Sequence, residues 1–276
     1  MTAPTPRIVN RLTVIGGGNM ASAIIAGLAK LPAPPAITVS EPDAGKRAVF
    51  TAAGHRAVAD NAEAIADAEV VLLATKPQAL AAVGADLAAS WRQDRLLVSI
   101  LAGIPTAKLE AVLQSSCHAP RVVRAMPNTP MAIGKGMVGI CPGANAGIAD
   151  LIAAEALFAP CARILRVDES RMDAITAVSG SGPAYFFRFA EALLAGAQQL
   201  GFTRDEAALL IGTTGAGAWD YLIESGFAAS RLREQVTSPG GTTAAALAVI
   251  DASGFDALWT KALQAAETRG QELANS

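Results

Sequence analysis

The chain of 276 residues carries little charge. Charged residues make up 17% of it and aromatic residues 5%, whereas 52% are hydrophobic. The formal net charge is −2, and lysines and arginines are scattered, so the sequence has no basic patch of the kind that binds nucleic acid. A composition this apolar indicates that part of the protein surface is buried between subunits. We therefore expect an oligomer that acts on a small molecule.

Cysteines and long apolar runs are also scarce. The three cysteines, Cys117, Cys141 and Cys161, are odd in number and lack a C-x-x-C spacing. This argues against a disulfide framework and a zinc site, so we expect no metal and a cytoplasmic location. The apolar runs fall short of the ~18 residues of a membrane span, and MTAPTPRIVN has no signal-peptide pattern. We expect a soluble protein without membrane contact.

The hydrophobic period changes along the chain. From Arg11 to about Val167, helical stretches alternate with predicted strands, which are RLTVIG, AITVS, AEVVLLAT, RLLVSIL, RVVRAM, GMVGIC and CARILRV. After Asp168 the pattern is helical, with SGSGP as a break and a capping box from Thr203 to Glu206. This predicts an α/β Rossmann-type N-terminal domain over residues 1–167 and an all-α C-terminal domain over residues 168–276.

A glycine-rich pattern lies near the start of the first domain. In VIGGGNMASAIIAGL, Gly16, Gly18 and Ala21 form a G-x-G-x-x-A pattern that follows a predicted strand and opens a predicted helix. Glu41 ends the next predicted strand, about 20 residues further on. Free N–H groups at such a helix start bind pyrophosphate. The alternative is a purely structural turn, but the combined context predicts a dinucleotide site.

Glu41 bears on the choice of cofactor. A carboxylate here accepts hydrogen bonds from the adenosine ribose and repels a 2′-phosphate, which favours NADH. Lys46 and Arg47 could instead pair with that phosphate, or all three form an ordinary solvated helix start. We expect NADPH or NADH, with Glu41 tilting the preference slightly towards NADH.

Two proline-anchored loops follow predicted strands, ATKPQ from Ala74 to Gln78 and MPNTP from Met126 to Pro130. Ligands of this architecture bind beyond the carboxyl ends of the strands, so these loops are expected to rim the nicotinamide. The plainer alternative is that Pro77 and Pro130 occupy ordinary helix-start or turn positions.

The second half lacks proton-transfer groups, because no lysine or histidine occurs from Asp168 to Thr260. An alcohol dehydrogenase needs a group that accepts the hydroxyl proton. A reductase of a C=N bond can receive a protonated substrate, so that hydroxyl donors and correct positioning suffice. The candidate donors are Ser179, Ser181 and Tyr185 in SGSGPAY, and Ser238, Thr242 and Thr243 in SPGGTT.

These two segments precede helices and present backbone N–H groups together with hydroxyls. An uncharged helix start of this kind can bind a carboxylate without burying a lysine or arginine beside the hydride path. The sequence therefore predicts an anion site in SPGGTT, where the alternative is a plain turn and helix cap.

The chain resembles the Δ1-pyrroline-5-carboxylate reductase family from Arg11 to about Leu273. The segments VIGGGNM, ATKPQ, RVVRAMPNTP, AVSGSGPAYFF and VTSPGGTT stand in the family's order and at similar spacings. The resemblance implies NAD(P)H-dependent reduction of L-1-pyrroline-5-carboxylate to L-proline, the last step of proline biosynthesis. It also implies that the C-terminal helices are a dimerisation domain, which forms an intertwined homodimer that often assembles into larger rings such as a decamer.

Together with the patterns above, the resemblance assigns site residues. The cofactor-binding residues are Ile15, Gly16, Gly17, Gly18, Asn19, Met20 and Ala21 at the pyrophosphate turn, Glu41 and Asn61 near the adenosine, and Ala74, Thr75, Lys76, Pro77, Ala102 and Asn128 near the ribose and nicotinamide. The substrate-binding residues are Ser179, Ser181, Ser238, Gly240, Gly241, Thr242 and Thr243. Thr243, by resemblance close to the ring nitrogen, is the catalytic candidate.

The chain departs from the family at three places. Glu41 is acidic where many relatives carry Ser, Asn or Arg, Thr75 replaces a usual valine, and GFAASRL lacks a common proline. Two other readings remain. A β-hydroxyacid dehydrogenase-like oxidoreductase would need a catalytic lysine in the second half, and a non-catalytic cofactor-sensing protein would have no use for both substrate loops.

Overall fold

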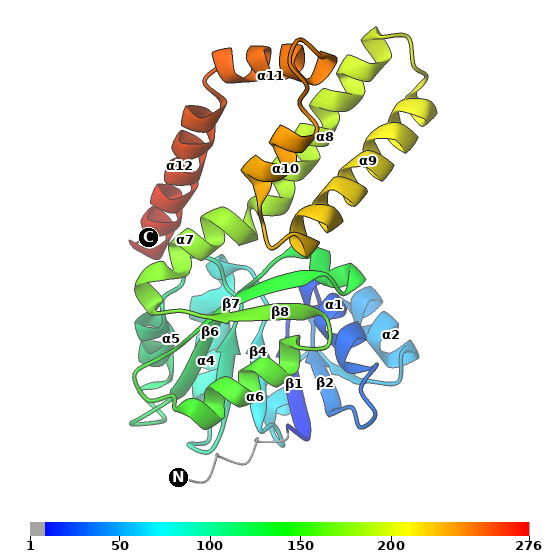
Figure 1. Cartoon of the computed structure of the whole chain (residues 1–276). Helices are drawn as coiled ribbons and strands as arrows, with labels where there is room; N and C mark the ends of the chain where they lie inside the picture. Colours follow the sequence, from blue (N-terminus) through cyan, green and yellow to red (C-terminus); the bar gives the residue numbers. More distant parts are fainter. Residues whose placement is uncertain (1–8, 276) are drawn as a thin grey trace. The chain divides into compact units, whose positions relative to one another are not determined.

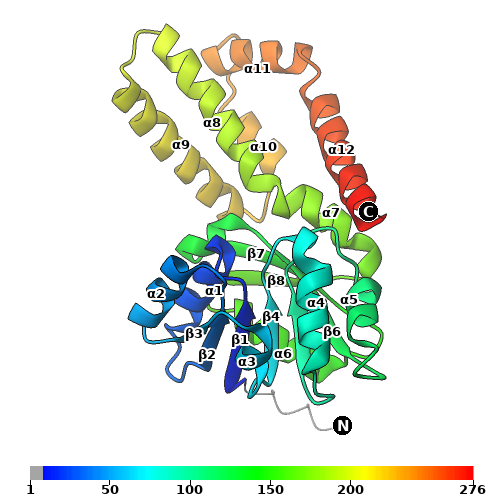
Figure 2. The same ribbon diagram turned by 180° about the vertical axis from the view of Figure 1, so that it is seen from behind.

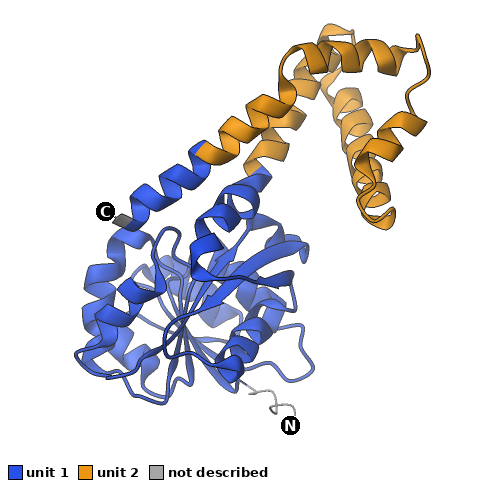
Figure 3. Cartoon of the chain, turned by 60° about the vertical axis from the view of Figure 1, so that its left-hand side comes forward, with its two compact units in different colours: residues 1–183, 265–276 blue, residues 184–264 orange. Residues whose placement is uncertain are grey.

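The computed structural model describes residues 9–275 of the chain (Figure 1). The N-terminal segment MTAPTPRIVN is predicted to lack a signal peptide. Its residues 1–8 lie outside the described part of the chain. The chain divides into two compact units, residues 1–183 with 265–276 and residues 184–264 (Figure 3). We call them the sheet unit and the helical unit. The predicted domain boundary at residue 167 follows the last strand, which ends at Arg166.

One sheet of eight strands forms the centre of the sheet unit. The strands are β1 (Arg11–Ile15), β2 (Ala36–Ser40), β3 (Arg56–Val58), β4 (Val70–Leu73), β5 (Leu96–Ser99), β6 (Arg121–Pro127), β7 (Gly136–Pro142) and β8 (Ala162–Arg166). All seven predicted strands are present. The three-residue β3 was missed, because a run as short as RAV has no readable period.

The strand order is β3-β2-β1-β4-β5-β6-β7-β8. The neighbours pair in parallel, except that β7 runs antiparallel to β6. The order reverses direction between β1 and β4, which makes a crevice beyond their carboxyl ends. The predicted α/β Rossmann-type fold is confirmed.

Helices cover both faces of this sheet (Figures 1 and 2). They are α1 (Asn19–Leu28), α2 (Ala44–Ala52) and α6 (Ile148–Phe158) on one face, and α3 (Asn61–Ile65), α4 (Leu80–Ala89) and α5 (Thr106–Leu113) on the other. Each face encloses its own buried cluster of aliphatic side chains. Because both faces are covered, the strands β4 and β5 are buried at every position, as their continuously apolar sequences predict.

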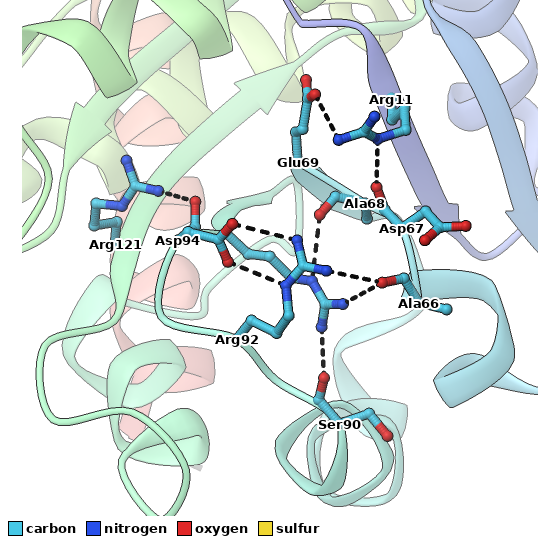
Figure 4. Close-up of polar contacts among 10 residues, drawn as sticks. Arg11, Ala66, Asp67, Ala68, Glu69, Ser90, Arg92, Asp94 and Arg121 are labelled. Carbon is cyan, nitrogen blue, oxygen red and sulfur yellow. Dashed lines mark hydrogen bonds and ion pairs between the residues drawn. The ribbon is translucent and has the colours of Figure 1, made fainter.

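Arginines bind backbone carbonyls where the parallel strands begin (Figure 4). Arg95, which is 2% exposed, donates to Ala66 O at 2.8 Å, to Ala68 O at 3.3 Å and to Ser90 O. Arg92 adds a bond to Ala66 O at 3.2 Å, and Arg11 bridges Glu69 at 3.0 Å. These guanidiniums satisfy carbonyls at the ends of α3 and α4. The amino edge of the sheet is therefore structural, and the opposite edge is free for a site.

The chain continues into helices after β8. They are α7 (Met172–Ile175), α8 (Gly182–Gln199), α9 (Arg204–Glu224), α10 (Ala229–Gln235), α11 (Thr242–Ala252) and α12 (Phe255–Asn275). The predicted capping box is confirmed, since Glu206 N donates to Thr203 Oγ1 at 3.3 Å and Thr203 N donates to Glu206 Oε2 at 2.8 Å. The predicted break at SGSGP is wrong: Thr176–Gly180 forms a π-helical turn that leads into α8.

The helical unit buries almost nothing by itself. Among residues 184–264, Ala207 alone is buried. Large apolar side chains are exposed instead, for example Phe187 at 63%, Leu209 at 70% and Val249 at 72%. Within residues 9–275, no helix is long and apolar enough to cross a membrane. So much exposed apolar surface on paired helices is typical of a subunit interface.

Candidate functional site

The glycine-rich turn joins β1 to α1 at the carboxyl edge of the sheet. Gly16 has φ +97°, a left-handed conformation that favours glycine, and a Cβ there would lie 2.9 Å from Ala74 O. Gly18 is the N-cap of α1, so no side chain caps the helix, and the first turn contains no acidic residue. The N–H groups of this turn can therefore bind an anion. Ala21 is buried where α1 packs on the sheet.

Glu41 lies directly against this turn. Its carboxylate is 6% exposed, and it accepts hydrogen bonds from Gly17 N at 2.9 Å and from Asp43 N at 3.1 Å. A Cβ at Gly17 would lie 2.6 Å from the ring of Phe50 and 3.3 Å from Glu41 Oε2. The backbone, Phe50 and the carboxylate thus form a narrow cradle that only glycine fits, with a fixed negative charge on one side.

The two cations after Glu41 do not pair with its carboxylate. Arg47 donates to Glu41 O at 2.8 Å and to Pro42 O at 2.7 Å, and the backbone N–H of Lys46 binds the helix cap Asp43 at 2.8 Å. The guanidinium of Arg47 therefore lies beside the end of β2. The end of β2 thus has two charged groups nearby: the carboxylate of Glu41, which suits a ribose 2′-hydroxyl, and the guanidinium of Arg47, which suits a 2′-phosphate.

Asn61, the first residue of α3, connects three elements. It accepts from Ser40 Oγ at 2.7 Å and donates to Asp86 Oδ2 at 2.9 Å. Both interactions tie the end of β2 to α4 on the adenosine side predicted from the resemblance. The partners Ser40 and Asp86 were not predicted, since nothing in the sequence marks them.

The segment after β4 lies next to the glycine turn. Ala74 N donates to Ile15 O at 2.8 Å, and Thr75 Cγ2 would be 3.1 Å from a Cβ at Gly16. The hydroxyl of Thr75 is buried and has no hydrogen-bond partner within the described chain. Lys76 occupies the N-cap position of a 3₁₀ turn without a side-chain capping bond, and Pro77 is the first residue of that turn, which is the ordinary helix-start position considered above.

A cavity of about 510 Å³ lies beside this segment. Pro77 and Ala102 line it together with apolar side chains of α4 and α5, Leu273 of α12, and Lys108 as a charged group. The glycine-rich turn does not line it. The cavity therefore extends the predicted nicotinamide side outward along α4 and α5, and it does not reach the pyrophosphate turn.

Asn128 follows β6 and holds the π-helical turn. Its side chain, 9% exposed, accepts from Met137 N at 2.9 Å and donates to Ser179 O at 3.2 Å. Gly180 approaches β6 so closely that a Cβ there would lie 2.4 Å from Met126 Cε. Asn128 and Ser179, predicted as cofactor-binding and substrate-binding residues, are thus in direct contact. Ser181 closes the turn by donating its N–H to Thr176 O at 2.8 Å.

A buried ion cluster supports the same region and was not predicted. The Arg124 guanidinium, 3% exposed, pairs with Glu169 and with Asp173, the latter at 3.2 Å. Burial raises the pKa of Glu169, but hydrogen bonds from Thr106 N at 3.2 Å and from Arg124 outweigh it and hold that pKa below its ordinary value.

Cys141 borders this cluster, with its Sγ 3.4 Å from Glu169 Oε2. Burial, together with the charge of Glu169, raises the pKa of the Cys141 thiol to about 12. A thiol with so high a pKa is a poor nucleophile at neutral pH. Of the described residues, no group of three or more His, Cys, Asp or Glu is arranged to hold a metal ion.

In the helical unit, SPGG forms the turn before α11. Gly240 has φ +71°, Gly241 N donates to Ser238 O at 3.0 Å, and a Cβ at Gly241 would lie 2.5 Å from Ser238 Oγ. Gly241 is the N-cap, with no side-chain cap and no acidic residue in the first turn. Thr242 is exposed and Thr243 partly exposed. The start of α11 thus offers free N–H groups and two hydroxyls to an anion.

The remaining candidate donor is Tyr185 on α8. Its ring packs against Trp259 of α12, with the ring centroids 5.6 Å apart. Ser179 and Ser181 belong to the sheet unit, whereas Tyr185 and Ser238 to Thr243 belong to the helical unit.

The chain matches two family models. Residues 169–273 match the model described as pyrroline-5-carboxylate reductase dimerisation, and residues 11–103 match the model described as NADP oxidoreductase coenzyme F420-dependent. Neither model covers residues 104–168, and the dimerisation model begins next to Asp168, where the hydrophobic period changes.

Relatives that match nearly the whole chain include several pyrroline-5-carboxylate reductases. A pyrroline-5-carboxylate reductase of Pseudomonas aeruginosa is 44% identical over 96% of this chain and 97% of its own length. A solved pyrroline-5-carboxylate reductase of Coxiella burnetii is 36% identical and superposes with a TM-score of 0.88 over 98% of this chain and 100% of its own. The Plasmodium falciparum pyrroline carboxylate reductase with NADP bound is 25% identical, with a TM-score of 0.85 over 98% of this chain and 100% of its own.

Proposed function

This chain belongs to the pyrroline-5-carboxylate reductase family, and we propose that it reduces L-1-pyrroline-5-carboxylate to L-proline with NADH or NADPH, the last step of proline biosynthesis. Family membership decides against the β-hydroxyacid dehydrogenase-like alternative. That alternative would also need a lysine in a region where the sequence has none, from Asp168 to Thr260.

The glycine-rich turn fits the pyrophosphate of a nicotinamide dinucleotide. The left-handed Gly16, the uncapped start of α1 and the narrow cradle at Gly17 are the features that such a group requires. When bound, the cofactor supplies the hydride. Ile15 to Ala21 hold the pyrophosphate, Glu41 and Asn61 lie on the adenosine side, and Ala74 to Pro77, Ala102 and Asn128 bound the nicotinamide half.

The start of α11 holds the carboxylate of the substrate. The single observation that carries this assignment is the uncapped N-terminus of α11, where glycine replaces the usual capping side chain and Thr242 and Thr243 provide hydroxyls. The N–H groups and the helix dipole stabilise the anion, and Ser238, Gly240 and Gly241 shape the turn. Ser179 and Ser181, which the resemblance assigns to substrate binding, lie in the sheet unit just before α8.

Thr243 orients the imine. The hydride adds to the imine carbon, and the π electrons of the C=N bond move to the nitrogen. If the substrate arrives with its nitrogen protonated, this step gives the amine without a further proton. A hydrogen bond between Thr243 and the ring nitrogen fixes the carbon at the distance that hydride transfer needs. The chain therefore needs no histidine or lysine as an acid.

The active form is a homo-oligomer, as the dimerisation domain indicates. A second copy of the helical unit would cover the exposed side chains of α8, α9 and α11, which a monomer would leave in water. We infer a homodimer that assembles into a decamer. The three unpaired, buried cysteines agree with a cytoplasmic location.

A spectrophotometric assay tests the function. Oxidation of NADH and NADPH is followed with pyrroline-5-carboxylate and with a cyclic imine that lacks the carboxyl group. We expect turnover of pyrroline-5-carboxylate and a loss of at least about 100-fold in kcat/KM without the carboxyl group, because the anion site is then left unused. Equal rates with both imines would contradict the role of α11, and no turnover of either would contradict the reductase assignment.

A further inference from the structure

The hydroxyl of Thr75 has no hydrogen-bond partner. Among the described residues, two buried side-chain polar atoms are unpaired, Thr75 Oγ1 and Trp91 Nε1. An unpaired buried hydroxyl costs free energy, so most buried polar groups have partners and an exception calls for an explanation. Trp91 lies just before β5, at the amino edge of the sheet. Only Thr75 lies at the carboxyl edge.

The surroundings of Thr75 place it against the glycine turn. It follows β4, the neighbour of β1 at the point where the strand order reverses. Its Cγ2 faces Gly16, at 3.1 Å from the position of a Cβ there, and the adjacent Ala74 N binds Ile15 O at 2.8 Å. The side chain thus borders the crevice in which folds of this class hold a dinucleotide.

The side chain can turn towards that crevice. Thr75 as a residue is partly exposed, although its hydroxyl is buried. Rotation about the Cα–Cβ bond by about 120° exchanges the positions of methyl and hydroxyl. Because the hydroxyl gives up no protein hydrogen bond when it turns, an acceptor oxygen in the crevice gains the full benefit of the new bond.

We propose that Thr75 Oγ1 donates a hydrogen bond to an acceptor oxygen of the bound dinucleotide, on the pyrophosphate or on the nicotinamide-side ribose. The inference rests on the proposed function, which supplies the dinucleotide, and adds a specific donor to it. Thr75 is then a cofactor-binding residue whose hydroxyl serves the ligand and not the fold.

The test is Thr75→Val, which replaces the hydroxyl by a methyl of nearly the same shape. We expect the dissociation constant for NADH to rise about tenfold, measured by fluorescence titration, while the melting temperature of the ligand-free protein stays at or above that of the wild type. Thr75→Ser keeps the hydroxyl and is expected to bind NADH within about threefold of the wild type.

The matched control is Thr13→Val on β1. Thr13 Oγ1 is equally buried but donates to Ala64 O at 2.8 Å. Its loss leaves a carbonyl unpaired, so this variant is expected to melt at a lower temperature and to bind NADH as the wild type does. Thr75→Val is therefore expected to change the affinity for NADH and to leave stability intact, whereas Thr13→Val is expected to lower stability and to leave the affinity for NADH intact.

Fragments of the cofactor locate the acceptor. If Thr75→Val weakens ADP as much as NADH, the pyrophosphate is the acceptor; if it weakens ADP-ribose but not ADP, the ribose is. Both results support the proposal. If Thr75→Val leaves the dissociation constant for NADH unchanged, as expected when a trapped water satisfies the hydroxyl, the proposal is overturned. An equal loss of affinity for AMP, or a lower melting temperature of Thr75→Val, also overturns the proposal. A wild-type protein that binds neither NADH nor NADPH would overturn the proposed function itself.

Discussion

Two helices of this molecule, α1 and α11, begin in the same way but in different surroundings. Each has glycine as its N-cap, no capping side chain and no acidic residue in its first turn. Each turn also contains a left-handed glycine, Gly16 with φ +97° or Gly240 with φ +71°. The turn before α1 lies on a buried sheet, and Glu41 already binds one of its N–H groups. The turn before α11 is largely exposed and belongs to a unit without a core.

This difference separates two requirements of an anion site. The free N–H groups come from local sequence, since glycine at the N-cap removes the competing side chain. We expect selectivity to come from what surrounds the turn, which is a buried carboxylate at α1 and the exposed or partly exposed hydroxyls of Thr242 and Thr243 at α11. We therefore expect the first turn to discriminate between ligands by charge and the second by hydrogen bonding.

Removing the hydroxyl at the start of α11 should have the largest effect. Thr243→Ala is expected to lower kcat/KM for pyrroline-5-carboxylate by about 10- to 1,000-fold, because one preorganised hydrogen-bonding group is lost. The dissociation constant for NADH should not change, since the cofactor site that we propose lies at α1. Steady-state kinetics and fluorescence titration measure the two quantities.

Thr243→Ser should recover most of the activity. Thr260→Ala, which removes a hydroxyl of α12 that binds Asp256 O, is expected to behave as the wild type. Wild-type kinetics for Thr243→Ala would show that hydrogen bonding at α11 does not serve the reaction.

The ion cluster under the π-helical turn makes the sheet unit sensitive to acid. Since the pKa of Glu169 is lowered by folding, its stabilising contribution is present above the unfolded pKa near 4.5 and is lost as pH falls through the folded value. Glu169→Gln is expected to lower the free energy of unfolding by about 2 kcal/mol at pH 7, because it weakens the pairing of the buried Arg124.

Denaturant unfolding at pH 7 and at a series of acidic pH values checks this expectation. The difference in unfolding free energy between wild type and Glu169→Gln should shrink as the pH falls through the lowered pKa of Glu169, because the carboxyl then becomes protonated. Glu63→Gln, which removes the exposed partner of Arg56, should change stability by no more than about 0.5 kcal/mol. A difference that persists unchanged in acid would show that the charge of Glu169 is not what stabilises the cluster.

Neutralising the Glu41 carboxylate at α1 should have the smallest effect, which is a change in the preference between NADPH and NADH. Glu41→Ser is expected to raise the ratio of kcat/KM with NADPH to that with NADH about five- to tenfold, because it removes a negative charge that faces the 2′-phosphate. Glu41→Gln retains an acceptor for Gly17 N and should shift the ratio in the same direction. An unchanged ratio in both variants would mean that Arg47, and not Glu41, governs the choice.

Much of the fold could be predicted from local sequence. Continuous apolar runs marked seven strands, and Thr203 with Glu206 marked the start of α9, because these signals depend on neighbouring residues. The glycine turns were recognisable for the same reason. What escaped prediction depends on distant contacts: the bond between Asn128 and Ser179, the burial of Arg124, and the unpaired hydroxyl of Thr75. The π-helical turn also escaped, because glycines and serines in SGSGP suggest a break when the packing against Met126 is not known.

The path of the chain has a consequence for how the protein is made. Leu273 meets Gly103, and Gly270 meets Asp173, so residues after 264 complete the packing of a unit whose strands were synthesised long before. During translation the sheet can form early, but the last helix reaches it only after the entire helical unit has left the ribosome. Until then the surface of the sheet unit that α12 covers is exposed, and the apolar side chains of the helical unit stay exposed until a second copy covers them. The interval before both events is when a nascent chain of this design most needs protection from aggregation.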